Sequence, residues 1–276
     1  MRKTFKNLKC HPKHKTNKSC MNNKLIIKMR DKWNSRHPDK IIKTKTPHLI
    51  ETQLRSYISI CNDQKCIMDN TFGKSFTKTA GLFAPNVPDS WNTSRSEWLD
   101  SLDILRVMKQ YEEAYPNFEF LGPTPIDFDS YKADKCVWPE ICNLNIKDQL
   151  KKHNKIGIIF NLDPHYKEGS HWVSMFIDLE HKYILYFDSS GYKMPKEIQL
   201  LIDNVVKQCK ELNINMKLYD NENIRHQYTD GECGIYCLYT IITLLVKNHS
   251  IKSFLKHKIP DDKMNAYRHT IYNYEL

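Results

Sequence analysis

The sequence predicts an α+β fold in which a meander of short strands is followed by helices, with further helices before it. Three apolar runs between residues 156 and 188 are separated by short gaps, which is typical of antiparallel strands. The chain beyond residue 195 changes to helical periodicity. Strands followed by segregated helices indicate the α+β class. With 276 residues, the chain can bury a core without help from disulfides or metals.

The first third of the chain shows signals for three helices. Ser19 is a candidate cap for a helix over about 20–33, which His37-Pro38 ends. Pro47 opens a second helix that ends near Cys61, and Ser94 caps a third over about 95–114.

A linker signal, Phe-Ala-Pro-Asn-Val-Pro, occupies residues 83–88. We therefore predict a basic, mainly helical N-terminal arm domain over residues 1–88 and a second domain over residues 89–276.

The second domain carries the strand signals. We expect strands at 156–162, 171–179, 183–188 and 216–219. Helices are expected from Pro195 to about Cys209 or Leu212, from Cys233 to about Lys247, and from Asp261 to about Tyr272. The helix beginning at Cys233 is apolar on most sides, which predicts a central, buried position.

The charge of the chain is concentrated at one end. The whole sequence has 42 Lys and Arg against 32 Asp and Glu, a net charge of +10. Residues 1–46 hold 15 basic and 2 acidic residues, or +13, so the remainder carries −3. Such a segment attracts polyanions, DNA or an acidic partner among them. A solvated segment that only keeps the protein soluble is an equal alternative.

Composition excludes several protein classes. An apolar fraction of 40% and a charged fraction of 27% fit neither a disordered chain nor a membrane protein. The longest apolar stretch, 235–246, is too short to span a bilayer, and no apolar run follows the basic N-terminus as a signal peptide requires. Nine cysteines, an odd number at irregular spacing, suggest reduced thiols in a cytosol-like compartment.

Three residues form a candidate catalytic set. Cys233 stands at the start of a predicted helix, where unpaired N–H groups and the helix dipole favour a thiolate. In an antiparallel pair, His171 at the start of one strand approaches Asp188 at the end of the next. A carboxylate that orients an imidazole, which in turn serves a thiol, is the arrangement needed for nucleophilic catalysis.

Nearby residues extend this set. Gln227 precedes Cys233 by six residues, and its amide can join the Cys233 backbone N–H in donating to an oxyanion. Gly231 and Gly234 allow a substrate to approach the backbone closely. Each residue alone has an ordinary structural explanation, so the prediction depends on their order and spacing together.

These motifs resemble a known family. His171-Trp172, Asp188, Gln227 and the run from Asp230 to Gly234 are similar to the active site of the SUMO-specific and adenovirus-type cysteine proteases. The likeness extends to the polyprotein-processing protease of African swine fever virus and its relatives in giant DNA viruses. There it includes 169–173, 223–227 and 232–234, and the N-terminal pieces 17–20 and Cys61…Cys66.

The resemblance implies a papain-like core, with a central mixed sheet flanked by helices, that cleaves viral core polyproteins after Gly-Gly during virion maturation. His171 would be the base, Cys233 the nucleophile, Gln227 the oxyanion donor and Asp188 the orienting group. An Asn stands at the position of Asp188 in the swine fever relative, which implies that the carboxylate is less critical. Trp172 is the expected wall of a narrow substrate channel that only glycine fits.

The resemblance also implies where the enzyme acts and what it meets. The expected site of action is the host cytoplasm, in virus factories, and the virion. The expected partner is a protein substrate with Gly-Gly-X sites. Adenovirus relatives use DNA and a peptide as activators, so residues 1–46 could serve a similar purpose. We expect no cofactor, no metal and no transmembrane segment.

Several alternatives remain open at this stage. The enzyme could instead remove SUMO-like or ubiquitin-like modifiers from host proteins, or be an acetyltransferase on the same fold. A non-catalytic, basic packaging protein is the fourth possibility.

Other residues are weaker candidates for a site. Cys10, His11, His14 and Cys20 match no common zinc spacing, and Cys61…Cys66 has the same weakness. His165, His226 and Asp178 rank behind the set described above, as do Cys142, Cys209 and Cys237.

Overall fold

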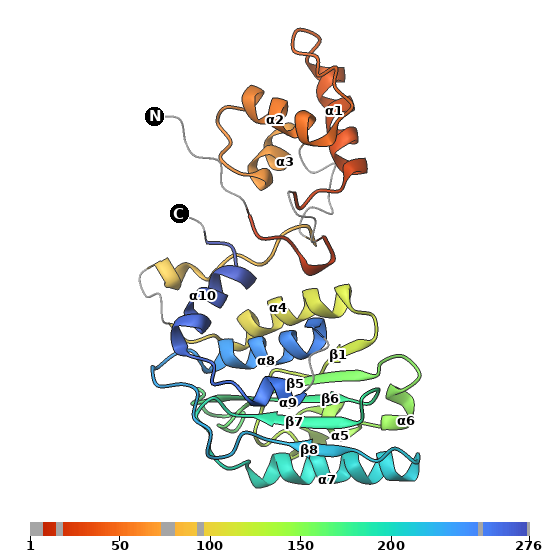
Figure 1. Ribbon diagram of the computed structural model, residues 1–276, viewed down its shortest axis with the longest axis vertical. Coiled ribbons are helices and arrows are strands. Elements are labelled where there is room, and N and C mark those ends of the chain that lie inside the picture. The colour runs from red at the N-terminus through yellow and green to blue at the C-terminus, as the bar shows by residue number, and fades with distance from the viewer. Residues whose placement is uncertain (1–7, 15–18, 73–80, 93–96, 248–250, 275–276) are drawn as a thin grey trace. The chain divides into compact units, whose positions relative to one another are not determined.

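The computed structural model describes residues 8–14, 19–72, 81–92, 97–247 and 251–274 (Figure 1). The chain divides into two compact units. The first comprises Met1–Asn86 together with Ile271–Leu276, and the second comprises Val87–Thr270. The sequence alone placed residues 271–276 in the second domain, whereas they group with the first unit.

The first unit contains helices α1 (Asn23–Arg36), α2 (Pro47–Tyr57) and α3 (Gln64–Phe72), after a short 3-10 helix at Pro12–His14. Ser19 does not cap α1. The side chain of Asn22 does so by accepting a hydrogen bond from the N–H of Leu25. The sequence did not predict α3, and the predicted helix from Pro47 is shorter than expected, ending at Tyr57.

The basic N-terminal segment is part of a folded core. Met29, Trp33 and Ile42 from this segment are buried against Leu54 of α2 and Ile67 of α3. The charged side chains of residues 19–46 therefore lie at the surface of a packed helical unit.

Asn273 fastens the C-terminal segment into the first unit. Its side-chain amide donates to the carbonyls of Lys9 and Ala84, and its Oδ1 accepts from the N–H of Lys9. Its own backbone N–H donates to the carbonyl of Pro85. The side chain is 5% exposed, so these bonds are shielded from water.

Six of the nine cysteines are paired, which corrects the prediction of reduced thiols. The disulfides are Cys10–Cys20, Cys61–Cys66 and Cys136–Cys142, and the free thiols are Cys209, Cys233 and Cys237. The odd number of cysteines suggested reduced thiols, but a chain of nine cysteines can equally hold three disulfides and three free thiols. Each disulfide closes a loop of ten residues or fewer, which spacing alone does not reveal.

The second unit is built around a mixed sheet with strand order β1-β5-β6-β7-β8. Its strands are β1 (Phe118–Phe120), β2 (Thr124–Pro125), β5 (Lys155–Asn161), β6 (Trp172–Asp178), β7 (Tyr183–Phe187) and β8 (Lys217–Tyr219). The pairs β5–β6 and β6–β7 are antiparallel, which confirms the predicted meander. Parallel pairs of β1 and β2 with β5, and of β7 with β8, make the sheet mixed.

Helices cover both faces of this sheet, as predicted (Figure 1). Side chains alternate along each strand, so Ile158 and Met175 point to the face packed on α7 (Lys196–Glu211). The opposite face packs against α8 (Cys233–Lys247), whose Ile241 lies close to Gly157. The predicted central helix from Cys233 is therefore confirmed, and its residues 233–245 are buried.

The remaining elements complete the second unit. A 3-10 helix lies at Asp89–Asn92, and α4 spans Ser101–Ala114. The predicted cap Ser94 lies outside the described residues, and Asp100 caps α4 through a capping box with Asp103. The smaller elements are β3 (Tyr131–Lys132), β4 (Lys135–Cys136), α5 (Pro139–Cys142), α6 (Ile146–Gln149), α9 (Ile251–Leu255) and α10 (Asp261–Ile271). Among the described residues, no helix has the length and apolarity to cross a membrane.

Candidate active site

His171 and Asp188 lie together at one end of the meander. The antiparallel register pairs Ser174 of β6 with Phe187 of β7. Continued by one residue, it places Asp188 opposite Val173, and His171 lies two residues from Val173 on the same side of the strand. The Nε2 atom of His171 lies 2.7 Å from Oδ1 of Asp188. The Asp188 side chain is 1% exposed and that of His171 is 20% exposed, so one ring edge remains open to solvent.

Cys233 is the third member of this cluster. It is the first residue of α8, and its thiol forms a hydrogen bond with the imidazole of His171. Since Nε2 of His171 faces Asp188, Nδ1 is the ring nitrogen that remains for the thiol. The N-terminus of α8 adds unpaired N–H groups and a positive dipole end, which favour a thiolate.

The electrostatics of the cluster keep His171 protonated. Burial alone lowers the pKa of His171, but the hydrogen bonds and charges of Asp188 and Cys233 outweigh it and raise the pKa to about 9. The imidazole is therefore a cation at neutral pH. A cationic imidazole beside a cysteine is the arrangement that activates sulfur as a nucleophile.

The two other free thiols lack these features. Burial raises the pKa of Cys209 to about 11, and it raises the pKa of Cys237 even more strongly, with help from the nearby Cys233. Cys237 lies one turn further along α8 and contacts Ser174. Both thiols are held neutral, which is typical of structural cysteines.

Gln227 is fixed beside the Asp188 segment. Its Oε1 accepts a hydrogen bond from the hydroxyl of Ser189 at 2.7 Å, and its Nε2 donates to the carbonyl of Thr229 at 2.7 Å. Its backbone N–H donates to the carbonyl of Ser189. The side chain is 8% exposed, and one of its two amide N–H groups is not used by Thr229.

The glycines around Cys233 have defined geometric roles. Gly231 has a φ of +96°, which a residue with a side chain rarely adopts, and its carbonyl accepts from Arg268. A Cβ on Gly234 would lie 3.0 Å from the Leu99 side chain. Gly234 therefore permits close packing between the start of α8 and the segment before α4.

A cavity of about 940 Å³ reaches Gly169 and Trp172, on either side of His171 in the sequence, but His171, Asp188, Gln227 and Cys233 do not line it. Three tryptophans do: Trp98, Trp138 and Trp172. Trp172 is 5% exposed and donates its indole N–H to the carbonyl of Leu99, while Trp98 is 47% exposed. Trp172 directly follows His171, and Leu99 packs against Gly234, so the cavity wall is continuous with the residues that flank His171 and Cys233. Trp98 was not predicted, although the Trp-Leu-Asp run before α4 was visible in the sequence.

Two other histidines also pair with aspartates. His165 contacts Asp127 at 2.7 Å, and His181 contacts Asp178 at 2.9 Å. Neither pair has a hydrogen bond to a thiol among the described residues, so His171 is the histidine with both an acid and a sulfur partner.

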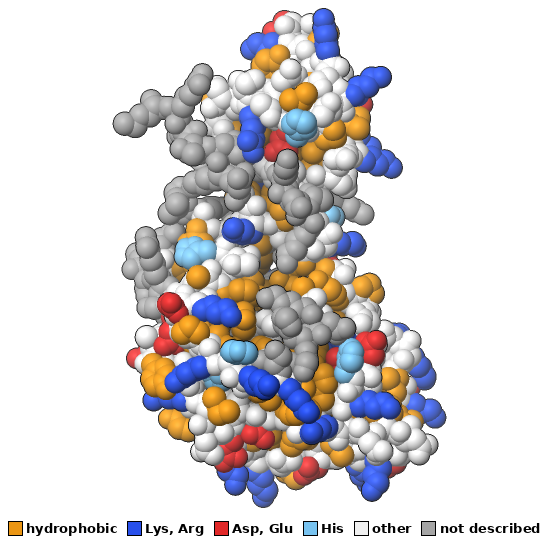
Figure 2. Space-filling model, in the orientation of Figure 1, with side chains coloured by type: hydrophobic (Ala, Val, Ile, Leu, Met, Phe, Trp, Pro, Cys, Tyr) orange, Lys and Arg blue, Asp and Glu red, His pale blue; other side chains and the backbone are white. Residues whose placement is uncertain are grey.

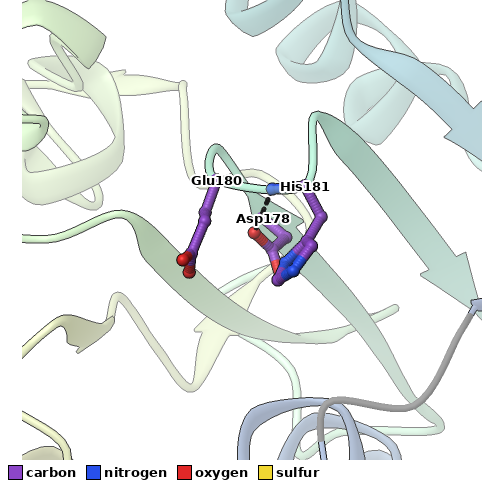
Figure 3. Close-up of side chains that lie close together, drawn as sticks. All are labelled: Asp178, Glu180 and His181. Carbon is purple, nitrogen blue, oxygen red and sulfur yellow. Dashed lines mark hydrogen bonds and ion pairs between the residues drawn. The ribbon is translucent and has the colours of Figure 1, made fainter.

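Asp178, Glu180 and His181 gather at the turn between β6 and β7 (Figure 3). Their candidate ligand atoms lie within 4.8 Å of one another. Lys155 already lies 3.9 Å from Asp178 and 3.7 Å from Glu180, so a cation of the chain balances the carboxylates. Asp178 accepts from the backbone N–H of His181, which makes it a turn cap.

The remaining weak candidates have structural roles. Cys10 is joined to Cys20, so the N-terminal cysteines and histidines do not form a zinc site with free thiolates. His226 is 2% exposed, accepts from the N–H of Ile259 and packs on Phe187. Burial, and then the charge of Lys258, lower its pKa, so it remains neutral.

Comparisons with known proteins identify the family of the chain. Residues 115–276 match the Ulp1 protease family, C-terminal catalytic domain. A protein of African swine fever virus (isolate Pig/Kenya/KEN-50/1950) named SUMO-1 cysteine protease is 31% identical over 223 residues, which cover 75% of this chain and 81% of that protein. A protein of Acanthamoeba polyphaga mimivirus, named as a thiol protease, is 31% identical over 178 residues. That match spans 64% of this chain and 57% of the mimivirus protein's length.

A solved structure shares the fold. The crystal structure of the African swine fever virus protease matches with a TM-score of 0.68 at 20% identity, and the match covers 99% of this chain and 98% of the other. The enzyme class is that of a cysteine-type peptidase. The chain belongs to the Ulp1 protease family of cysteine peptidases, and its relatives include proteases of large DNA viruses.

Proposed function

We propose that the chain is an endopeptidase in which Cys233 is the nucleophile and His171 the general base and acid. The observation that supports this most strongly is the double contact of His171, to the Asp188 carboxylate at 2.7 Å and to the Cys233 thiol. Asp188 fixes the ring so that Nε2 carries a proton and Nδ1 faces sulfur. The family membership is consistent with these roles.

The proposed reaction proceeds in two halves. The Cys233 thiolate attacks the scissile carbonyl carbon, and the oxygen becomes an oxyanion that accepts from the Cys233 backbone N–H and the Gln227 amide. The intermediate collapses, the C–N bond breaks, and His171 gives its proton to the leaving amine. His171 then takes a proton from water, which attacks the thioester, releases the acid and restores the thiolate.

We propose that the substrates carry Gly-Gly before the scissile bond, as in viral core polyproteins. Trp172, which directly follows His171, lines a cavity together with Trp98. A substrate chain that passes these rings on its way to Cys233 would be restricted in its side chains. Glycine has no Cβ and passes where other residues clash. The expected setting is the host cytoplasm, in virus factories, and the virion, which quantitative mass spectrometry of purified particles would test.

The substrate proposal is tested with a matched panel. Peptides with Gly-Gly-X, Ala-Gly-X and Gly-Ala-X are compared with a SUMO conjugate and a ubiquitin conjugate. We expect the Gly-Gly-X peptides to be cleaved directly after the second glycine, with kcat/KM at least about a hundredfold above the alanine peptides. Cleavage of the conjugates alone would instead make the enzyme a modifier protease, which is the alternative that the name of the swine fever relative suggests.

We also propose that the first unit binds a polyanion such as DNA. Its exposed basic residues include Lys24, Lys28 and Arg36 of α1, and Lys40, Lys43 and Lys45 of the segment between α1 and α2. On the face shown in Figure 2, Lys and Arg side chains also occur on the second unit, so the basic surface is not confined to the first. DNA affinity should fall steeply with salt and with substitution of Lys40, Lys43 and Lys45 by Glu. Affinity unchanged by these substitutions would contradict the proposal.

A further inference from the structure

We propose that Ser189 is a positioning residue for the oxyanion site, because its hydroxyl sets the orientation of the Gln227 amide. This inference rests on the proposed peptidase function and names a residue that the catalytic motif does not include. Ser189 directly follows Asp188 and is 1% exposed. Its Oγ lies 2.7 Å from Oε1 of Gln227, across 38 residues of sequence.

The orientation of the Gln227 amide follows from its two neighbours. The Thr229 carbonyl lies 2.7 Å from one end of the amide, and a carbonyl oxygen can only accept. That end must therefore be the NH₂ group. The other end is Oε1, and the hydroxyl of Ser189 donates to it. One N–H of Gln227 is used by Thr229, and the second is left for a substrate oxyanion.

The backbone of Ser189 adds to this constraint. Its carbonyl accepts from the N–H groups of both His226 and Gln227, each at 2.8 Å. Gln227 is thus held by residue 189 at its main chain and at the end of its side chain. With both ends fixed, the amide keeps one rotamer and does not lose orientation entropy when the oxyanion forms.

The preceding residue is fixed in the same way by Asn221, which is also 1% exposed. Oδ1 of Asn221 accepts from the N–H of Asp188 at 2.9 Å, and its Nδ2 donates to the carbonyl of Asp188 at 2.7 Å. The dipeptide Asp188-Ser189 therefore holds both halves of the proposed machinery. Residue 188 orients the His171 base, and residue 189 orients the Gln227 oxyanion donor.

The expected effect of Ser189→Ala lies in kcat. Without the hydroxyl, Oε1 of Gln227 loses its donor and the amide can rotate away, so part of the oxyanion stabilisation is lost. Removing a whole oxyanion donor costs about a hundredfold to a thousandfold in kcat, so we expect roughly a tenfold to hundredfold loss in Ser189→Ala, with KM nearly unchanged. Ser189→Cys keeps a side chain of similar shape with a weak S–H donor, so its kcat should lie between that of wild type and that of Ser189→Ala.

The experiment measures kcat and KM for wild type, Ser189→Ala, Ser189→Cys, Gln227→Ala and the Ser189→Ala/Gln227→Ala double variant on one peptide. Ser174→Ala is the control, since it removes another fully buried serine hydroxyl, from β6, where that group contacts Cys237. We expect Ser189→Ala to have no further effect once Gln227 is alanine, and Ser174→Ala to keep wild-type kcat. Urea unfolding of each variant identifies losses that come from misfolding.

Several results would overturn the inference. Wild-type kcat in Ser189→Ala is one, and an equal loss in the presence and absence of Gln227 is another, because it would mean that Ser189 acts through Asp188. If Ser189→Ala does not fold, wild-type kcat in Ser189→Cys, or a raised KM with normal kcat, decides against the inference. Failure of the peptidase proposal looks different: either wild type cleaves no peptide, or Cys233→Ala cleaves as fast as wild type, whatever residue stands at position 189.

Discussion

The Nε2 atom of His171 lies 2.7 Å from Oδ1 of Asp188, which leaves Nδ1 to serve the thiol of Cys233. This relationship assigns a separate partner to each ring nitrogen. In the proposed reaction, the cationic imidazole would also supply the proton that the leaving amine needs.

The first prediction concerns stability against pH. The pKa of His171 is about 9 in the folded protein, above the ordinary value of about 6.5 in an unfolded chain. The folded state holds this proton more tightly, so its contribution to stability is complete below pH 6.5 and disappears as the pH rises through 9. The difference in unfolding free energy between wild type and His171→Ala should narrow over that range. A difference that stays constant from pH 6 to 10 would contradict the assignment.

The second prediction concerns the charge of Asp188. Asp188→Asn retains an acceptor for Nε2 of His171 but removes the charge that helps to raise the His171 pKa. We expect kcat/KM to fall by about tenfold to a hundredfold, less than in His171→Ala, and the alkaline limb of the pH–rate profile to move to lower pH. A complete loss of activity would show that the carboxylate charge is required. An alkaline limb at the same pH as in wild type would show that the Asp188 charge does not raise the His171 pKa.

The third prediction concerns the packing of Gly234. A Cβ at this position would meet Leu99 at 3.0 Å, so Gly234→Ala must displace the segment that also accepts the indole N–H of Trp172. We expect the unfolding free energy in urea to fall by about 1–3 kcal/mol. Gly81→Ala is the matched control, because a Cβ there meets nothing within 4 Å. Equal stability of the two variants would refute the close-packing role.

The fourth prediction concerns the first unit alone. Asn273→Ala removes the side-chain bonds to Lys9 and Ala84, and at roughly 1 kcal/mol each we expect a local loss of about 2–3 kcal/mol. Hydrogen exchange measured by mass spectrometry should quicken at the amides of His11 and Ala84, whose bonds join the two segments that Asn273 links. Exchange as slow as in wild type would contradict the prediction. Asn23→Ala, an exposed position in the same unit, is the control.

Much of the second unit could be predicted because its strands are long, apolar and close in sequence. The meander from β5 to β7 requires only local pairing, and the apolar face of α8 follows from its composition. The strands β1 and β2 were missed because they are three and two residues long. Their pairing with β5 is parallel and crosses a long stretch of chain, so no local pattern indicates it.

The candidate site could be predicted in part for similar reasons. His171 and Asp188 end neighbouring strands, so the topology brings them together, and Cys233 is marked by the glycines around it. Ser189 and Asn221 could not be found, because a serine or an asparagine in a turn is common and their bonds connect residues 33 or more positions apart. The disulfides were missed because an odd number of cysteines in a sequence does not indicate which of them lie close enough to be bonded.

The most direct test of the central claim is cleavage of a Gly-Gly-X peptide by wild type, Cys233→Ala and Cys237→Ala, with the products identified by mass spectrometry. Cys237 is also a free thiol, one turn further along α8, so it controls for the loss of a sulfur atom from this helix. We predict that Cys233→Ala remains folded and cleaves nothing, whereas Cys237→Ala cleaves after the second glycine at nearly the wild-type rate. Cleavage by folded Cys233→Ala at the wild-type rate would contradict the assignment of the nucleophile.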